Sequence, residues 1–149
     1  MYKKILVATD LTPASEPAVK AALALAQTLG AQITALHVLD APVESGRWFL
    51  PESPELIAFR AAIDREQETI HEQLAAQLAS LAQGSVSASA IVRDGNPVDT
   101  IVGVADEIGA DLVIVGTHGR RGLQHALLGS VAERVVRTAN QAVLTVRSR

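Results

Sequence analysis

A chain of 149 residues, 48% of them hydrophobic and 19% charged, has the composition of one folded domain, 1–149, and excludes intrinsic disorder. With no cysteine, no signal-like start and no apolar run near the roughly 20 residues that cross a bilayer, we expect a cytoplasmic protein without disulfides or a membrane partner. The net charge of −3 and the aromatic content of 3% argue against nucleic acid as a partner.

Five apolar runs predict β-strands, and two of them are apolar enough to be buried on both faces of a sheet. The predicted strands are Ile5–Ala8, Ile33–Leu39, Val86–Val92, Leu112–Val115 and Val143–Val146.

Apolar residues at helical spacing fill the intervals between these strands. The first helix has Thr12 and Pro13 as start signals and Gly30 as a stop signal. A third helix is predicted within 96–109, opened by an Asn-Pro pair, and a fourth over 130–139.

The second predicted helix, from about Pro54 to Leu81, has a long apolar stripe. A coiled coil would also produce such a stripe, but one helix packed on a sheet explains it more simply. The stripe consists of Leu56, Phe59, Ile63, Ile70, Leu74, Leu78 and Leu81.

Strands that alternate with helices predict an α/β fold: a single open, mostly parallel five-stranded sheet with helices on both faces. Ligands of such sheets bind at the carboxyl ends of the strands. Three stretches should therefore converge there: Thr9 and Asp10 after the first strand, 38–40 at the end of the second, and a glycine-rich loop after the fourth.

The glycine-rich loop lies in GTHGRRGLQHALLGSVAERV, residues 116–135. Six arginines and one glutamate from Gly116 onward give +5, whereas seven basic and fifteen acidic residues before it give −8. Glycines let backbone N–H groups approach a ligand, and a helix amino terminus attracts anions. The stretch therefore fits a small anion, although most of these arginines also fit a solvated surface.

Two interpretations of the loop stay open on spacing alone. Neither the GxxxxGK[ST] nor the GxGxxG phosphate motif is present. Ser130 and Glu133 have the spacing of a capping box, which would explain the serine without a ligand. The loop is thus either a phosphate cradle or a purely structural turn.

The pattern G-x2-G-x9-G-S, formed by Gly116, Gly119, Gly129 and Ser130, resembles the nucleotide-binding signature of the universal stress protein family, in its ATP-binding branch. The similarity covers the whole chain, through KKILVATD, LHVLD, GNP, DLVIVGTHG and AVLTVR. It implies a Rossmann-like, adenine nucleotide alpha hydrolase-like fold with strand order 3-2-1-4-5. It also implies ATP, with Mg²⁺, as the ligand, and an association with survival under stress.

The resemblance implies a role for each matching position. Asp10 and Val38 would flank the adenosine, and Asp10 would also help to hold Mg²⁺. The residues that would approach ribose and phosphates are Gly116, Thr117, His118, Gly119 and Arg120, while Gly129, Ser130 and Val131 would hold the outer phosphates. Thr9 is also expected among the nucleotide-binding residues. Where the family usually has a serine near the aspartate and a proline before the last strand, this chain has Leu11–Thr12 and Gln141; Thr12 is expected to cap the first helix.

Other polar residues have ordinary structural explanations. Asp10 also fits a turn, His37 fits a buried core histidine, and His71 and His125 fit the surface. The four histidines have no metal-ligand spacing, and no nucleophile–base pair can be assigned. The sequence therefore predicts a binding site, with slow ATP hydrolysis at most.

The last strand indicates a second kind of contact. An apolar strand at a sheet edge pairs readily with another chain, and the resemblance implies a homodimer through Ala142, Val143, Leu144, Thr145 and Val146. The other interpretation is a short edge blunted by Arg147 and Arg149.

Three functions remain open. The first is a dimeric, ATP-dependent regulatory module that an unidentified protein partner reads. The second is a slow ATPase or phosphotransfer enzyme, in which Arg120 or Arg121 stabilises charge and Asp10 places the metal. The third is a nucleotide-free dimeric chaperone or scaffold with a structural glycine loop.

Overall fold

The computed structural model describes residues 1–40, 53–117 and 128–148. Three predicted site residues, His118, Gly119 and Arg120, lie outside the described residues, and so do Arg121, His125 and Arg149. The structure describes all of the other predicted site residues.

The predicted strands and helices are confirmed, with small changes at their ends. In chain order they are β1 (Lys4–Ala8), α1 (Glu16–Leu29), β2 (Gln32–Leu39), α2 (Pro54–Ala82), β3 (Ala88–Asp94), α3 (Pro97–Glu107), β4 (Leu112–Gly116), α4 (Ser130–Thr138) and β5 (Ala142–Val146).

Among the strands, the largest displacement is in β3, which begins two residues later than predicted. The reason is the end of α2, where Gln83 and Gly84 both adopt left-handed backbone angles, with φ of 47° and 74°. The turn that follows extends to Ser87, whose carbonyl is the first group to accept a hydrogen bond from β2, at 2.9 Å from the Ile33 nitrogen.

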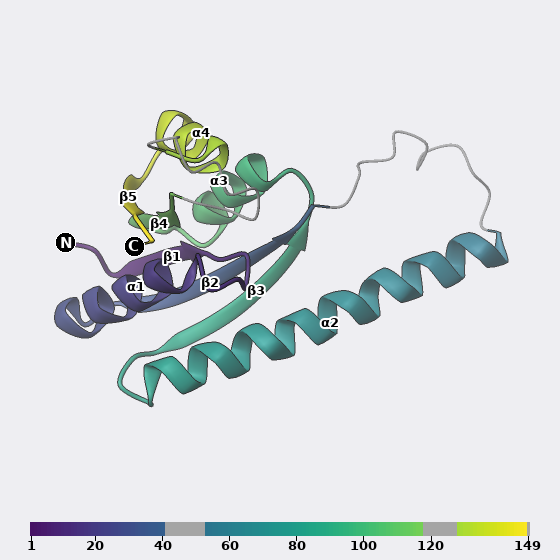
Figure 1. Ribbon diagram of the computed structural model, residues 1–149, viewed down its shortest axis with the longest axis horizontal. Helices are drawn as coiled ribbons and strands as arrows, with labels where there is room; N and C mark the ends of the chain where they lie inside the picture. Colours follow the sequence, from purple (N-terminus) through teal and green to yellow (C-terminus); the bar gives the residue numbers. More distant parts are fainter. Residues whose placement is uncertain (41–52, 118–127, 149) are drawn as a thin grey trace.

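The five strands form one parallel sheet in the order β3-β2-β1-β4-β5, as the resemblance implied. Figure 1 shows α1 and α2 on one face of this sheet and α3 and α4 on the other. Side chains alternate between the faces, so Ile5 and Val7 pack under α1 and α2 while Leu6 packs under α3 and α4. All three are almost fully buried, which stabilises the fold by about 1.5–3 kcal/mol for each side chain.

Local chemistry explains where α3 begins and where α1 ends. The Asn96 side-chain oxygen accepts hydrogen bonds from the Val98 and Asp99 nitrogens at 3.1 and 3.2 Å, as a cap of α3 should. Gly30 ends α1 with a left-handed φ of 61°. The prediction for Thr12 was wrong, because α1 begins four residues later, at Glu16, and Thr12 bonds to Asp10 instead.

The amino-terminal end of the sheet is tied together by Asp111. Its carboxylate accepts hydrogen bonds from the backbone nitrogens of Lys3 and Lys4 at 2.7 and 2.8 Å. These two bonds hold the pKa of Asp111 below its usual value. The start of β1 is thereby fixed beside β4, at the end of the sheet opposite to the predicted site.

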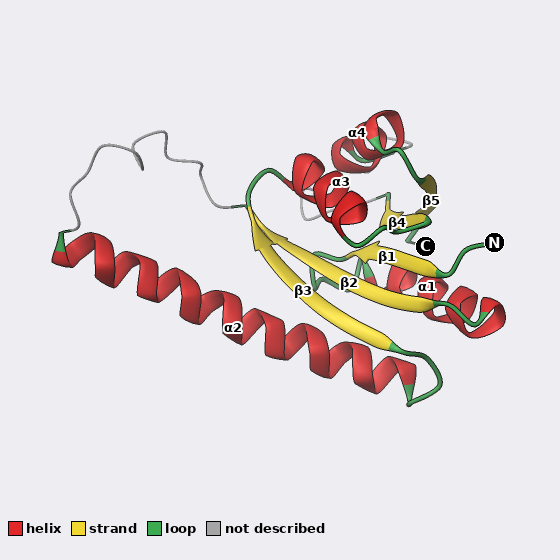
Figure 2. Cartoon of the chain, turned by 180° about the vertical axis from the view of Figure 1, so that it is seen from behind, coloured by secondary structure: helices red, strands yellow, loops and turns green. Residues whose placement is uncertain are grey.

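Helix α2 packs on the sheet only in its carboxyl-terminal half. Leu74, Leu78 and Ala82 are buried, whereas Ile57 and Phe59 are 55% and 59% exposed. The 29 residues of α2 span about 44 Å, but the eight residues of β2 span only about 26 Å. The helix therefore projects past the sheet (Figure 2), and the prediction that its whole apolar stripe packs on the sheet was wrong for the first half.

Two substitutions in α2 test the difference in burial between its two halves. We expect Leu74→Ala to lower the free energy of unfolding by about 2–5 kcal/mol, because it leaves a cavity under the sheet. Phe59→Ala should change it by no more than about 0.5 kcal/mol, because most of this side chain is exposed in the monomer. Urea unfolding measures the free energy of unfolding of both variants. An equal decrease in the two variants would contradict the observed packing.

None of the helices in the described ranges combines the length and the apolar composition that crossing a membrane requires.

Candidate functional site

The carboxyl ends of β1, β2 and β4 meet at one edge of the sheet. Ala8 pairs with Leu36 on one side and with Val115 on the other, so Thr9, His37 and Gly116 follow at the same level. β1 is also the strand at which the order reverses, since β2 and β3 lie on one side of it and β4 and β5 on the other. In doubly wound sheets this is the position of the ligand crevice.

The loop from β1 to α1 fixes Asp10 through hydrogen bonds. The Oδ1 of Asp10 accepts bonds from the backbone nitrogen and the hydroxyl of Thr12, at 2.9 and 2.5 Å. The next residue, Leu11, has a left-handed φ of 63°, which a residue with a side chain seldom adopts. Asp10 thus has the turn role that the sequence allowed, and its carboxylate is held at the carboxyl end of β1.

His37 is the buried, hydrogen-bonded histidine that the sequence predicted. It is 4% exposed, and its Nδ1 lies 2.9 Å from the carbonyl oxygen of Thr9. Because a carbonyl only accepts, Nδ1 carries the proton in this bond. The Thr9 hydroxyl is in turn 2.8 Å from that of Ser15, so the start of the loop is anchored to both β2 and the start of α1. Nothing in the sequence pattern indicated this anchor.

Val38 directs its backbone groups toward the carboxyl end of β1. The Leu36 carbonyl accepts a bond from the Thr9 nitrogen, at 2.9 Å, so even-numbered residues of β2 face β1. β1 ends at Ala8, and the N–H and C=O of Val38 therefore face the place where β1 has left the sheet. Such a pair of backbone groups can recognise the hydrogen-bonding edge of a flat heterocycle.

Gly129 crosses close to the end of β4. Its nitrogen donates to the Thr117 carbonyl at 2.7 Å, and the Thr117 nitrogen donates to the Val146 carbonyl at 2.9 Å. A Cβ added to Gly129 would lie 2.6 Å from the Thr117 oxygen, a distance that real Cβ atoms do not adopt. Glycine at position 129 is therefore required by this backbone crossing, with or without a ligand.

The capping box at the start of α4 was a wrong prediction. The N-cap is Gly129, and Ser130 is the first residue of the helix, without a side-chain capping bond. The Glu133 carboxylate pairs instead with Arg137, at 3.0 Å. The structural explanation of Ser130 is thus removed, and both Ser130 and Val131 are exposed in the first turn, where backbone N–H groups have no acceptor within the helix.

Thr9, Asp10, Val38, Gly116, Thr117, Gly129, Ser130 and Val131 therefore all lie at the carboxyl end of the sheet or at the start of α4. The described residues contain no cluster of three His, Asp or Glu side chains that could hold a metal ion by themselves.

β5 lies at one edge of the sheet, as predicted. Its start is tied to α3, because the Gln141 Nε2 donates to the Asp106 carboxylate at 2.7 Å. Val146 accepts a bond from Thr117 on the β4 side, so Ala142 and Leu144 also face β4. The backbone groups of Val143 and Thr145 face away from the sheet.

These features define a doubly wound α/β domain with a candidate site at the carboxyl edge of its sheet, and comparison with known proteins gives its family. The model of the universal stress protein family matches residues 1–147. Universal stress protein MJ0531 of Methanocaldococcus jannaschii is 34% identical over 99% of this chain and 83% of its own length. The chain belongs to the universal stress protein family.

Solved structures agree with this assignment. The structure of MJ0577, also from Methanocaldococcus jannaschii, superposes with a TM-score of 0.82 at 27% identity, over 100% of this chain and 98% of that one. A universal stress protein solved in complex with cAMP superposes with a TM-score of 0.62 at 26% identity, over 98% and 97% of the two chains.

Proposed function

We propose that this protein binds ATP, with Mg²⁺, and acts as a dimeric nucleotide-dependent regulatory module in stress survival, inside the cytoplasm. The observation that carries the proposal is the start of α4, where Ser130 is exposed, free of a capping role and preceded by Gly129. The similar protein solved with cAMP supports an adenine nucleotide as the class of ligand.

The described residues fit such a nucleotide. The backbone N–H and C=O of Val38 would bind adenine, and the Asp10 carboxylate would accept from ribose hydroxyls or help to hold Mg²⁺. The amino terminus of α4 would bind the outer phosphates through the N–H groups of Ser130 and Val131 and through the helix dipole. Gly116 and Thr117 would border the phosphate chain, and His118, Gly119 and Arg120 would complete the site according to the family signature.

The dimer would form through β5. The outward N–H and C=O groups of Val143 and Thr145 are an open ladder edge, and Leu144 is 36% exposed beside them. Antiparallel pairing with β5 of a second copy would satisfy these backbone groups and cover apolar surface.

A short chain of hydrogen bonds would couple the nucleotide to the dimer. The Val146 carbonyl in β5 accepts from Thr117, and the Thr117 carbonyl accepts from Gly129 at the start of α4. A ligand shifts a conformational equilibrium only through different affinities for the two states. Phosphates that move the start of α4 would act on β5 through these two bonds, and a partner protein would read the resulting change.

Titration calorimetry of nucleotide-stripped protein tests the proposal. We expect saturable heat with ATP and Mg²⁺, and a higher melting temperature at saturation, because a ligand that binds only the folded state stabilises it. Absence of both heat and thermal shift would overturn the proposal and favour a nucleotide-free scaffold. Release of phosphate during the titration would instead indicate an ATPase.

A further inference from the structure

The second edge of the sheet, β3, also has an open row of backbone groups. The Ile33 nitrogen donates to Ser87, and the Gly95 nitrogen donates to Leu39. Because bonding alternates along a parallel ladder, the odd-numbered residues of β3 bond to β2. The N–H and C=O groups of Ala88, Ala90 and Val92 therefore point away from the sheet.

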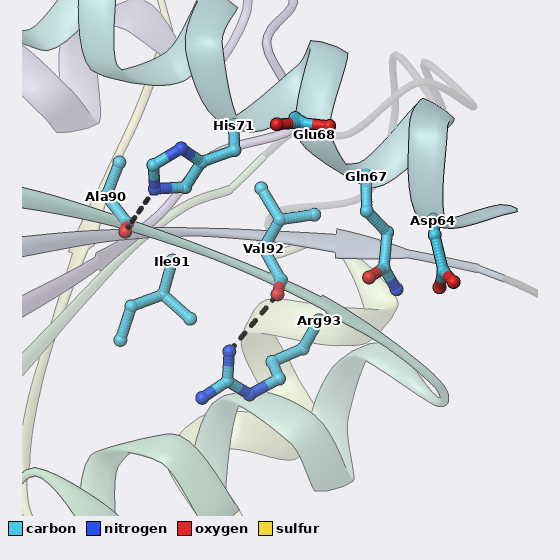
Figure 3. Close-up of a pocket in the computed structure, with 8 residues that line it drawn as sticks. All are labelled: Asp64, Gln67, Glu68, His71, Ala90, Ile91, Val92 and Arg93. Atoms are coloured by element: carbon cyan, nitrogen blue, oxygen red, sulfur yellow. Dashed lines mark hydrogen bonds between the residues drawn. The ribbon is translucent and has the colours of Figure 1, made fainter. Parts of the chain in front are cut away.

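Two of the outward carbonyl oxygens accept hydrogen bonds from exposed side chains. The His71 Nε2 lies 3.0 Å from the Ala90 oxygen, and the Arg93 Nη1 lies 3.3 Å from the Val92 oxygen (Figure 3). Within the described part of the chain, the outward N–H groups of Ala90 and Val92 have no acceptor. An incoming strand can supply carbonyls to these N–H groups and replace the two side-chain donors.

A groove runs along this edge between β3 and α2. A hollow of about 330 Å³ lies beside Ala90–Arg93, and a second of about 250 Å³ lies beside Val86–Ala90. Because both are lined by Ala90, they lie end to end along the strand. One face of α2 lines both hollows, through Asp64, Glu68, His71, Ala75, Leu78, Ala79 and Ala82.

The two ends of the groove differ in chemistry. The end near Arg93 has the carboxylates of Asp64 and Glu68, and Arg93 itself is paired with Glu107 at 3.5 Å. The end near Ala88 has small apolar side chains. Figure 3 shows the acidic side chains on α2, across the groove from the strand.

We propose that this groove binds an extended basic peptide of a partner protein by strand addition to β3. The main chain of the peptide would bond to Ala90 and Val92, its lysines or arginines would lie beside Asp64 and Glu68, and small apolar residues would occupy the other end. This surface is at the sheet edge opposite to β5 and does not depend on the nucleotide.

Fluorescence anisotropy with a labelled, end-blocked octapeptide of alternating valine and lysine tests the proposal. We expect saturable binding that weakens by about tenfold or more when glutamate replaces lysine in the peptide, or when Asp64→Asn and Glu68→Gln are combined in the protein. A peptide with methylated backbone nitrogens should bind no better than the glutamate peptide. Equal binding of the methylated peptide would overturn strand addition, and no binding of any peptide would overturn the whole proposal.

Two proline substitutions in β3 distinguish a loss of peptide binding at the edge from a general loss of stability. Ala90→Pro removes an N–H that points outward, so it should weaken peptide binding and leave the melting temperature near that of the wild type. Ile91→Pro removes an N–H that bonds to β2 and should lower the melting temperature. If Ala90→Pro leaves peptide binding unchanged, or if it only reduces self-association of the protein, the proposal is wrong. Ser130→Ala should leave peptide binding intact.

Discussion

Replacing Ser130 with aspartate is expected to weaken the proposed ATP binding strongly while leaving the protein at least as stable as the wild type. A carboxylate about 4 Å from a phosphate charge costs about 4 kcal/mol at an effective dielectric constant of 20, so ATP affinity should fall by more than about 100-fold. The same carboxylate in the first turn of α4 interacts favourably with the helix dipole, by about 0.3–1 kcal/mol. Calorimetry with ATP and thermal unfolding measure the two effects.

Ser130→Ala is the matched control for this experiment. It removes only the hydroxyl, so we expect a smaller loss of ATP affinity and little change in melting temperature. Gly129→Val is a poor probe, because a Cβ there clashes with Thr117 whatever the ligand does. Unchanged ATP affinity in Ser130→Asp would show that the phosphates do not lie at the start of α4, even if ATP binds elsewhere.

Thr145→Pro is expected to convert the proposed dimer into a monomer without unfolding it. The Thr145 nitrogen faces away from β4, so proline removes a donor only from the proposed ladder between the two copies. We expect the dissociation constant of the dimer to rise by at least about 100-fold. Sedimentation velocity over a range of protein concentrations measures this change.

Two further variants make this result interpretable. Thr145→Val keeps the N–H and should stay dimeric, whereas Leu144→Pro breaks the ladder to β4 and should destabilise the fold itself. Since coupling between two binding events is reciprocal, a change in the free energy of ATP binding per site in the monomeric variant must be half the change that two bound ATP molecules produce in the free energy of dimerisation. A Thr145→Pro protein that remains dimeric would place the dimer contact elsewhere.

The sheet was predictable because its signals are local. Runs such as LVIV and ILVA are apolar on both faces, and Asn96, Pro97 and Gly30 mark helix ends by their own chemistry. The burial of α2 was not predictable in this way. Its apolar stripe continues beyond the length of the strands, and only the sizes of the assembled elements show that Phe59 has no sheet beneath it.

The candidate site was predictable where position along a strand decides it, as for Asp10, Val38 and Gly116. The roles of Thr12 and Ser130 could not be predicted from the sequence, because a capping role depends on the residue at which a helix begins. The bond from His37 to Thr9 joins two strands, and no spacing within one stretch of sequence contains it.

Because Gly129 lies so close to Thr117, a glycine at this position of the family signature is not by itself evidence of nucleotide binding. A relative of this protein that does not bind a nucleotide would still need glycine at position 129, because any larger residue would push α4 away from β4. Selection for folding alone would therefore preserve glycine at position 129. Ser130 has no such packing requirement and no capping role, so under the proposed function its replacement is a better sign than loss of the glycine that a relative does not bind the nucleotide.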